Sequence, residues 1–227
     1  MNIDRLFEFE EQDAGYILKK YLLENDRSVT DVEIPSEYKG KPVIGIGDYA
    51  FFNAYFLNSV RISEGVEKIG HGAFDQCDDL KTVILPDSLT VIESVAFQGC
   101  TKLENISFPR ELKVIGELAF DHCGIRSLVL PAGLEELGRS AFVMCLELRS
   151  VVLPEKLKVI RNRTFLCCVN LESIEFSEGL KKIGELAFYK CGFKTLTFPS
   201  SLNRSTTRHS STAKSLKRSI IKAVLPL

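Results

Sequence analysis

Histidine and cysteine are the side chains of this chain that could support catalysis or bind a metal. The 227 residues include three histidines, His71, His122 and His209, and seven cysteines. A catalytic Cys–His pair needs spatial approach and a third group that orients it, whereas His122 and Cys123 are sequence neighbours whose side chains point differently. Neither a G-x-x-x-x-G-K-[ST] loop nor a G-x-S-x-G motif occurs. We therefore expect no enzymatic activity, no catalytic residues and no cofactor site.

Six of the seven cysteines recur at intervals of 22 or 23 residues, and Cys167 is extra. The recurring set is Cys77, Cys100, Cys123, Cys145, Cys168 and Cys191. Zinc sites need close pairs such as C-x-x-C, which this spacing does not provide, so we assign no metal ligands. Free cysteine is a common small buried hydrophobe, and reduced thiols in a core are our first interpretation. Disulfides between stacked neighbours, or a bound metal, are the alternative.

The cysteine interval belongs to a longer repeat, which is clearest in VEKIGHGAFDQCDDLKTVILPDS, residues 66–88. The next copy shows the same pattern after a shift of 23 residues, and the third copy is one residue shorter. Seven copies lie between Val43 and Ser201, with Ala54 in the first cysteine position and Ser177 in one proline position. Numbered from the copy quoted above, copies one to six begin at Val66, Leu89, Leu112, Leu134, Leu157 and Leu180, and the seventh copy lies upstream and begins at Val43. A fixed period between 20 and 29 with an L-x-x-V-x-L core indicates a leucine-rich-repeat solenoid.

The spacing within one copy predicts its local structure. Val83 and Leu85 lie two residues apart, which places both on one face of a strand, and Pro86 ends that strand because it has no N–H to donate. Ala73, Phe74 and Cys77 are spaced by three and four, which fits one helical turn with a buried face. We therefore expect an α/β repeat solenoid: a right-handed stack with a parallel sheet on one face and short helical turns on the other.

The repeated unit I-G-x-x-A-F-x-x-C-x-x-L-x-x-V-x-L-P resembles the BspA-like branch of the leucine-rich-repeat family, over about residues 29–202. Members of this branch occur mainly in bacteria and some protozoan parasites, and many are surface proteins that adhere to host matrix or mediate aggregation. The resemblance implies a non-enzymatic protein-binding or adhesion module. The alternative is an intracellular scaffold for protein interactions.

Three segments follow from the pattern. Residues 1–42 are predicted to form an N-terminal cap with a truncated repeat that covers the first hydrophobic flank. Residues 43–202 form the seven-repeat solenoid. Residues 203–227 are a basic, Ser/Thr-rich tail that is either disordered or forms a short amphipathic helix near its end; a C-terminal cap and a disrupted last repeat are alternatives.

The exposed face of the predicted strands is the likeliest contact surface, because alternation keeps its side chains out of the core. Solenoid curvature would gather them on a concave face, which repeat proteins commonly use for binding. Copies three and four contribute adjacent arginines, small polar residues and exposed valines. The predicted protein-binding residues are Arg126, Ser127, Val129, Arg149, Ser150 and Val152. An acidic or host-matrix protein would fit the two arginines, whereas the alternative is that this face is solvated surface.

Charge limits the possible partners further. Six of the 29 basic residues follow Leu202, so the rest of the chain has 23 basic and 30 acidic residues, a net charge of −7. An acidic body argues against nucleic acid as the partner of the solenoid. The N-terminus shows no secretory signal, and no run of residues is long and apolar enough for a membrane span. We therefore expect a cytoplasmic location, with the cell surface or secretion as the alternative from the resemblance; the oligomeric state is not predicted.

Overall fold

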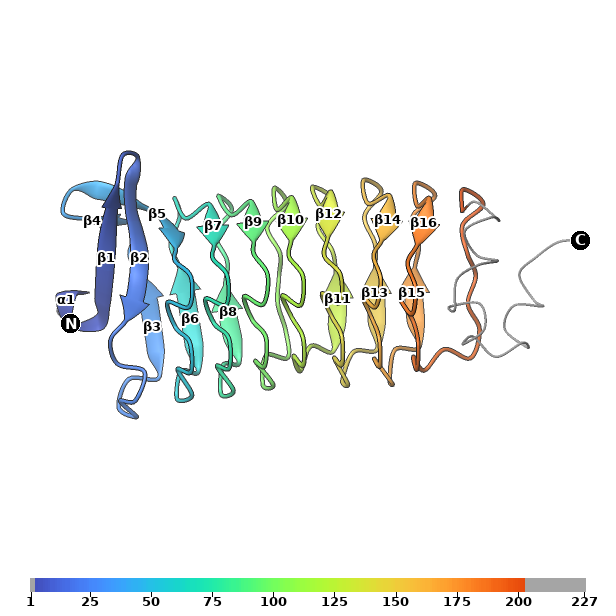
Figure 1. Ribbon diagram of the computed structural model, residues 1–227, viewed down its shortest axis with the longest axis horizontal. Helices are drawn as coiled ribbons and strands as arrows, with labels where there is room; N and C mark the ends of the chain where they lie inside the picture. The colour runs from blue at the N-terminus through green and yellow to red at the C-terminus, as the bar shows by residue number, and fades with distance from the viewer. Residues whose placement is uncertain (1–2, 203–227) are drawn as a thin grey trace, which may run out of the picture.

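The computed structural model describes residues 3–202, and Figure 1 shows them as a row of coils stacked along one axis. These residues contain a single short α-helix, α1 (Ile3–Leu6), and are otherwise strands and turns. The molecule is a β-solenoid of about seven coils with parallel sheets. The predicted repeat solenoid is thus confirmed, although its helical part is not.

Most coils contribute a strand to each of two rows, which run along the stack in Figure 1. We call them row A and row B. Row A consists of β5 (Lys41–Ile46), β7 (Lys68–Ile69), β9 (Val91–Ile92), β10 (Val114–Ile115), β12 (Glu136–Leu137), β14 (Val159–Ile160) and β16 (Lys182–Ile183). Row B consists of β3 (Asp31–Ile34), β6 (Ser59–Ile62), β8 (Thr82–Ile84), β11 (Ser127–Val129), β13 (Ser150–Val152) and β15 (Ser173–Glu175).

Neighbouring strands pair in parallel with a register of one repeat, except that β12 and β14 in row A, and β8 and β11 in row B, are not paired. In row A, Ile46 lies beside Ile69, which lies beside Ile92. In row B, Leu128 lies beside Val151. These residues are buried, whereas Ser127 and Val129 on either side of Leu128 are exposed. The alternation follows from the period of two in a strand, and it confirms which strand positions face the core.

The predicted helical turns are wrong. Ala73, Phe74 and Cys77 are buried as expected, but they lie in two consecutive turns, closed by Ala73 N–H to Gly70 O and Cys77 N–H to Phe74 O. Gly72 and Gln76 have φ of +58° and +60°, a left-handed conformation that no right-handed helix contains.

The corresponding backbone hydrogen bonds run between coils instead. Gly72, Phe74 and Gln76 donate to the carbonyls of Ser94, Ala96 and Gln98 in the next coil, at 3.1, 2.7 and 2.8 Å. In a helical turn these N–H groups would donate to carbonyls of the same turn and could not donate to the next coil. The hydrogen bonds between coils are therefore incompatible with a helix here.

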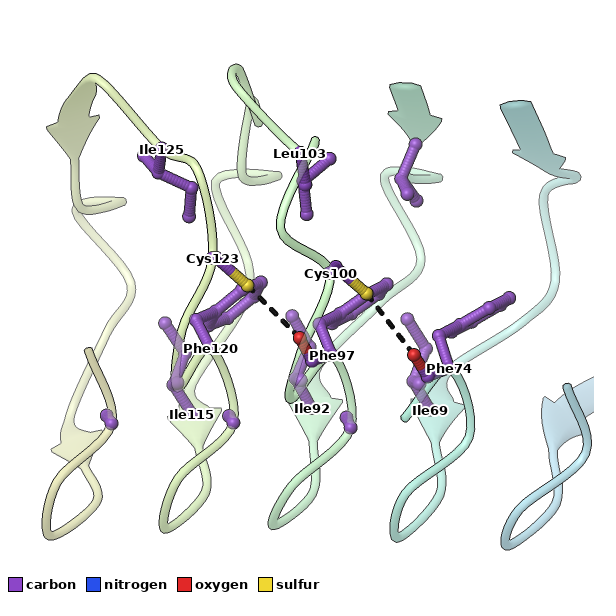
Figure 2. Packing of buried hydrophobic residues seen from close by; sticks show 14 of the residues in the cluster. Ile69, Phe74, Ile92, Phe97, Cys100, Leu103, Ile115, Phe120, Cys123 and Ile125 are labelled. Atoms are coloured by element: carbon purple, nitrogen blue, oxygen red, sulfur yellow. Dashed lines mark hydrogen bonds between the residues drawn. The ribbon is translucent and has the colours of Figure 1, made fainter. Parts of the chain in front are cut away.

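A column of phenylalanine rings runs through the core, one from each coil: Phe51, Phe74, Phe97, Phe120, Phe142, Phe165 and Phe188. Successive ring centroids are 4.7–5.7 Å apart, and the rings are nearly parallel, as Figure 2 shows for three of them. Within the column each ring stacks only on the rings of the adjacent coils, so the core is continuous while its contacts are local.

A hairpin precedes the first coil. β1 (Phe7–Gln12) and β2 (Gly15–Tyr21) are antiparallel, β2 pairs with β5 in parallel, and β4 (Glu37–Tyr38) pairs with the other end of β5. Tyr21, the last residue of β2, stacks on Phe51 at 5.1 Å and so heads the ring column. The predicted tail, residues 203–227, lies outside the described residues.

Candidate functional site

The structure brings the six predicted binding residues together on row B. Ser127 pairs with Ser150 and Val129 with Val152, across two adjacent strands. Arg126 and Arg149 directly precede these strands, and the N–H of Arg149 donates to the carbonyl of Arg126 at 2.8 Å. Val129 has 67% of its surface exposed, an unusual degree for a valine in a sheet. The exposed surface formed by these residues is therefore one continuous patch.

A groove of about 980 Å³ lies beside this patch. Of the six predicted residues it is lined by Ser127, Val129 and Val152, whereas Arg126, Arg149 and Ser150 lie outside its lining. Residues that the sequence did not single out complete it: Asn105, Ile106, Ser107, Phe108, Arg110, Leu130, Pro131, Ala132, Leu153, Pro154, Glu155 and Lys156. We call this feature the row B groove.

The row B groove coincides with an interruption of the sheet. β8 and β11 are not paired with one another, and residues 105–108 between them form no strand, although they occupy the equivalent place in copy two. Residues 105–108 are paired neither with β8 nor with β11. The one-residue deletion in copy three explains the second of these missing pairings, because it shortens the turn that leads into β11. At that turn a Cβ on Gly124 would lie 2.3 Å from the carbonyl oxygen of Thr101, so only glycine fits.

Copy six shows the same relationship, which supports the explanation. Its turn is also shortened, Gly192 lies where a Cβ would be 2.5 Å from the carbonyl oxygen of Val169, and residues 195–197 form no strand beside β15. The shortened repeat was visible in the sequence, but its consequence for strand pairing was not predicted.

The floor of the groove is apolar. Ile106 and Phe108 are half-buried and pack against the core, with the ring of Phe108 edge-on to that of Phe120 at 5.6 Å. Because residues 105–108 are not held in a ladder, these side chains and the exposed Val129 leave apolar surface in the groove. Burying a valine of this kind contributes about 1.5 kcal/mol.

The charges around the groove are mostly positive but not all free. Arg126 donates from Nη2 to Oε1 of Glu104 in the preceding coil at 2.9 Å, and both side chains are exposed. Within residues 3–202, Arg149, Arg110 and Lys156 form no ion pair. The unpaired positive charge expected from the two adjacent arginines therefore comes from Arg149 alone. Arg110 and Lys156, which the sequence analysis did not single out, add to it.

The cysteine column is buried and its thiols are free. Cys77, Cys100, Cys123, Cys145 and Cys168 are buried, while Cys191 and the extra Cys167 are half-buried. Desolvation raises the pKa of the column thiols, well above the usual value at Cys100 and to about 12 at Cys191. A thiol held protonated is a poor nucleophile and a poor metal ligand.

His122 and Cys123 do not interact with one another. Nδ1 of His122 is hydrogen-bonded to the carboxylate of Asp121, whereas Sγ of Cys123 donates to the carbonyl of Phe97 at 3.1 Å. Asp121 is buried, which raises its pKa, and its second oxygen accepts from Nε2 of Gln98. The part of the chain that the structure describes has no group of three or more side chains placed to hold a metal ion, and no helix in it could cross a membrane.

Comparisons with known proteins agree with this architecture. The sequence profile of the BspA type leucine rich repeat region, in six copies, matches residues 17–149 and 135–223. The crystal structure of the T. pallidum leucine rich repeat protein is 31% identical, covers 96% of both chains and superimposes with a TM-score of 0.79. A leucine-rich repeat protein from Bacteroides ovatus is 29% identical over 87% of this chain, with a TM-score of 0.64; the chain spans 58% of that protein. No curated protein matches this chain.

A repeat profile that covers most of the sequence, together with a relative of the same length and coil arrangement, defines the class of protein. The chain belongs to the BspA-type leucine-rich repeat family, as its repeated motif indicated.

Proposed function

We propose that the chain is a non-enzymatic protein-binding module that holds an acidic segment of a partner protein in the row B groove. The observation that carries the proposal is the interrupted sheet, which exposes an apolar floor beside Val129; Arg110 and Lys156, which form no ion pair within residues 3–202, line the groove together with Glu155. Apolar surface supplies affinity, and cations that face solvent supply attraction for a negatively charged partner.

The chemistry of the buried side chains supports binding rather than catalysis. The column thiols are protonated, the His122 ring is held by Asp121, and the groove itself is lined by neither cysteine nor histidine. The family adds support of a general kind, because leucine-rich repeats are protein-binding folds.

The test uses two exposed valines, one on each row. Val129 lies on β11 in the groove, and Val159 lies on β14 of row A. Wild-type protein, Val129→Glu and Val159→Glu should be immobilised and exposed separately to extracellular matrix and to cytosolic extract. We expect a bound protein that Val129→Glu loses and Val159→Glu keeps. The extract that supplies it distinguishes an adhesion module from an intracellular scaffold, and equal binding by both variants would refute the groove as the site.

A further inference from the structure

A second concave site lies at the opposite end of the molecule from the shortened copy six, where the N-terminal hairpin meets the first coil. It is a pocket of about 350 Å³, and its lining includes Tyr21, Glu24, Tyr49, Phe52 and Tyr55. We call it the cap pocket. It shares no lining residue with the row B groove.

Two residues that line the cap pocket each have a buried polar atom without a hydrogen-bond partner within residues 3–202: the hydroxyl oxygen of Tyr21 and Oε2 of Glu24. Tyr21 is only 2% exposed. A buried polar atom without a partner is costly, so native proteins rarely keep one without a reason. Two such atoms in one pocket indicate a missing donor.

Tyr21 is also an exception within its own column. The seven rings that follow it are all phenylalanine, and Tyr21 stacks on the first of them with the same geometry. Phenylalanine at this position would therefore satisfy the packing of the column. The hydroxyl adds a polar atom that the hydrophobic core does not use, and that atom lies at the cap pocket.

The outer wall of the pocket is aromatic in this copy alone. Tyr49, Phe52 and Tyr55 are exposed by 41–49%, and the rings of Tyr49 and Phe52 meet at 83° with centroids 5.8 Å apart. The equivalent residues of copy one, which begins at Val66, are Gly72, Asp75 and Asp78, and among the seven copies only the one that begins at Val43 has three aromatic residues there. These exposed rings offer apolar surface against which the methylene groups of a long side chain can pack while its charged end lies elsewhere.

Carboxylates near the pocket supply the negative charge that a cationic ligand would need. Burial raises the pKa of Tyr21 to about 12, and the carboxylates of Asp26 and Glu24 contribute to the rise. Asp26 is already satisfied by the backbone N–H and hydroxyl of Ser28. Lys20 also lines the pocket, yet it is exposed and forms no ion pair with Glu24 within residues 3–202. Among the described residues, the carboxylate of Glu24 therefore has no ion-pair partner.

We propose that the cap pocket binds a primary alkylammonium group, such as a lysine side chain presented by a partner. Its N–H groups donate to Oε2 of Glu24 and to the hydroxyl oxygen of Tyr21, and its methylene chain lies against Tyr49, Phe52 and Tyr55. This site is separate from the row B groove, and the proposal stands or falls independently of the function proposed above.

The experiment titrates the full chain with three matched probes and follows the aromatic NMR signals. The probes are N-acetyl-lysine methylamide, its trimethylated analogue and N-acetyl-norleucine methylamide, which has an uncharged chain. We expect saturable binding of the lysine probe, with a Kd on the order of millimolar, because a single side chain makes few contacts. The trimethylated probe should bind several-fold more weakly because it has no N–H, and the norleucine probe should not bind.

Two variants and one control complete the test. Glu24→Gln keeps the shape but removes the charge, and should weaken binding of the lysine probe about tenfold. Tyr21→Phe introduces the residue that the rest of the column uses, so it should fold well and still weaken binding about fivefold. Tyr189→Phe removes the hydroxyl of a partly exposed tyrosine at the far end and should change nothing. Equal binding of lysine and norleucine probes, no saturable binding of the lysine probe, or unchanged binding by both variants would each overturn the proposal.

Discussion

The thiol of Cys100 donates a hydrogen bond to the backbone carbonyl of Phe74, 3.2 Å away in the preceding coil (Figure 2). All six column cysteines do the same with the phenylalanine one coil before, at 3.1–3.2 Å. The N–H of each phenylalanine bonds to the next coil, while its carbonyl otherwise receives only a long bond in its own turn, 3.4 Å at Phe74. Cysteine is small and apolar yet carries a donor, which explains its presence at this position.

The first prediction concerns this contact. Cys100→Ala should lower the free energy of unfolding by about 1–3 kcal/mol, because the carbonyl of Phe74 loses its thiol donor inside the core. Cys100→Ser keeps a donor and should cost less than the alanine. Denaturant unfolding measures both. Cys167→Ala is the control: Cys167 lies outside the column and is half-buried, so the change should stay within about 0.5 kcal/mol. An effect of Cys167→Ala as large as that of Cys100→Ala would contradict the assigned role.

The second prediction concerns thiol reactivity. Burial raises the pKa of the column thiols, so they remain protonated and unreactive in the folded state at pH 8. Titration with a thiol reagent should detect Cys167 first and the six column thiols slowly, and all seven after denaturation. Seven fast thiols in the native protein would refute buried, reduced cysteines.

The same shifts predict alkaline sensitivity. Well below pH 9, the usual pKa of a thiol, the column thiols are neutral in both the folded and the unfolded state, and their ionisation does not affect stability. Above pH 9 the thiols of the unfolded chain lose their protons, whereas those of the folded protein, such as Cys191 with a pKa of about 12, stay protonated. The free energy of unfolding should therefore fall as pH rises from 9 towards 12. Cys191→Ser should make that fall less steep, and an unchanged slope would contradict the raised pKa.

The ring column gives a prediction about position along the stack. Phe120 lies between Phe97 and Phe142 with centroids 5.2 Å away on both sides, so Phe120→Ala should cost about 3–5 kcal/mol by cavity formation. Phe188 is the last ring of the column, and Phe188→Ala should mainly loosen the last coils because contacts join only neighbours. Hydrogen exchange resolved along the chain distinguishes the two. Equal, global losses in both variants would contradict a core with local contacts.

A fifth prediction separates the two arginines of the site. Arg126 is paired with Glu104, whereas Arg149 has no ion pair among the described residues. Arg149→Glu should therefore weaken binding of an acidic partner more than Arg126→Glu, and the double variant should abolish it with little change in thermal stability. Lys81→Glu, in the equivalent turn position two copies earlier, is the control. A double variant that binds normally at low salt would show that these charges do not contribute.

Much of the fold could be predicted because its cause is local and repeated. The alternation around Leu128 and the phenylalanine and cysteine intervals each fix one buried face, and recurrence makes the register unambiguous. The turns at Ala73 and Phe74 could not be predicted correctly, because a spacing of three and four is shared by a helical turn and by two successive turns. Hydrogen bonding between coils, which no single copy contains, decides between them.

The site was predictable only in part for a similar reason. Strand alternation placed Ser127 and Val129 on the outer face. The groove, however, exists because residues 105–108 form no strand beside β11, and alternation within one strand does not predict this. The deletion at Gly124 was the available signal, and it carries meaning only once the carbonyl of Thr101 is known to lie against it. Arg110 and Lys156 belong to turns whose approach to the groove depends on stacking.

The binding role of the row B groove is tested most directly by placing a photo-crosslinking amino acid at Val129 and, in a matched variant, at Val159. Both valines are exposed, and they lie on different rows of the stack, two copies apart. With the partner recovered from matrix or cytosolic extract, crosslinks should form from position 129 and not from 159, and an excess of unlabelled wild-type protein should suppress them. Crosslinks from 159 alone, or equally from both positions, would contradict a binding site in the groove.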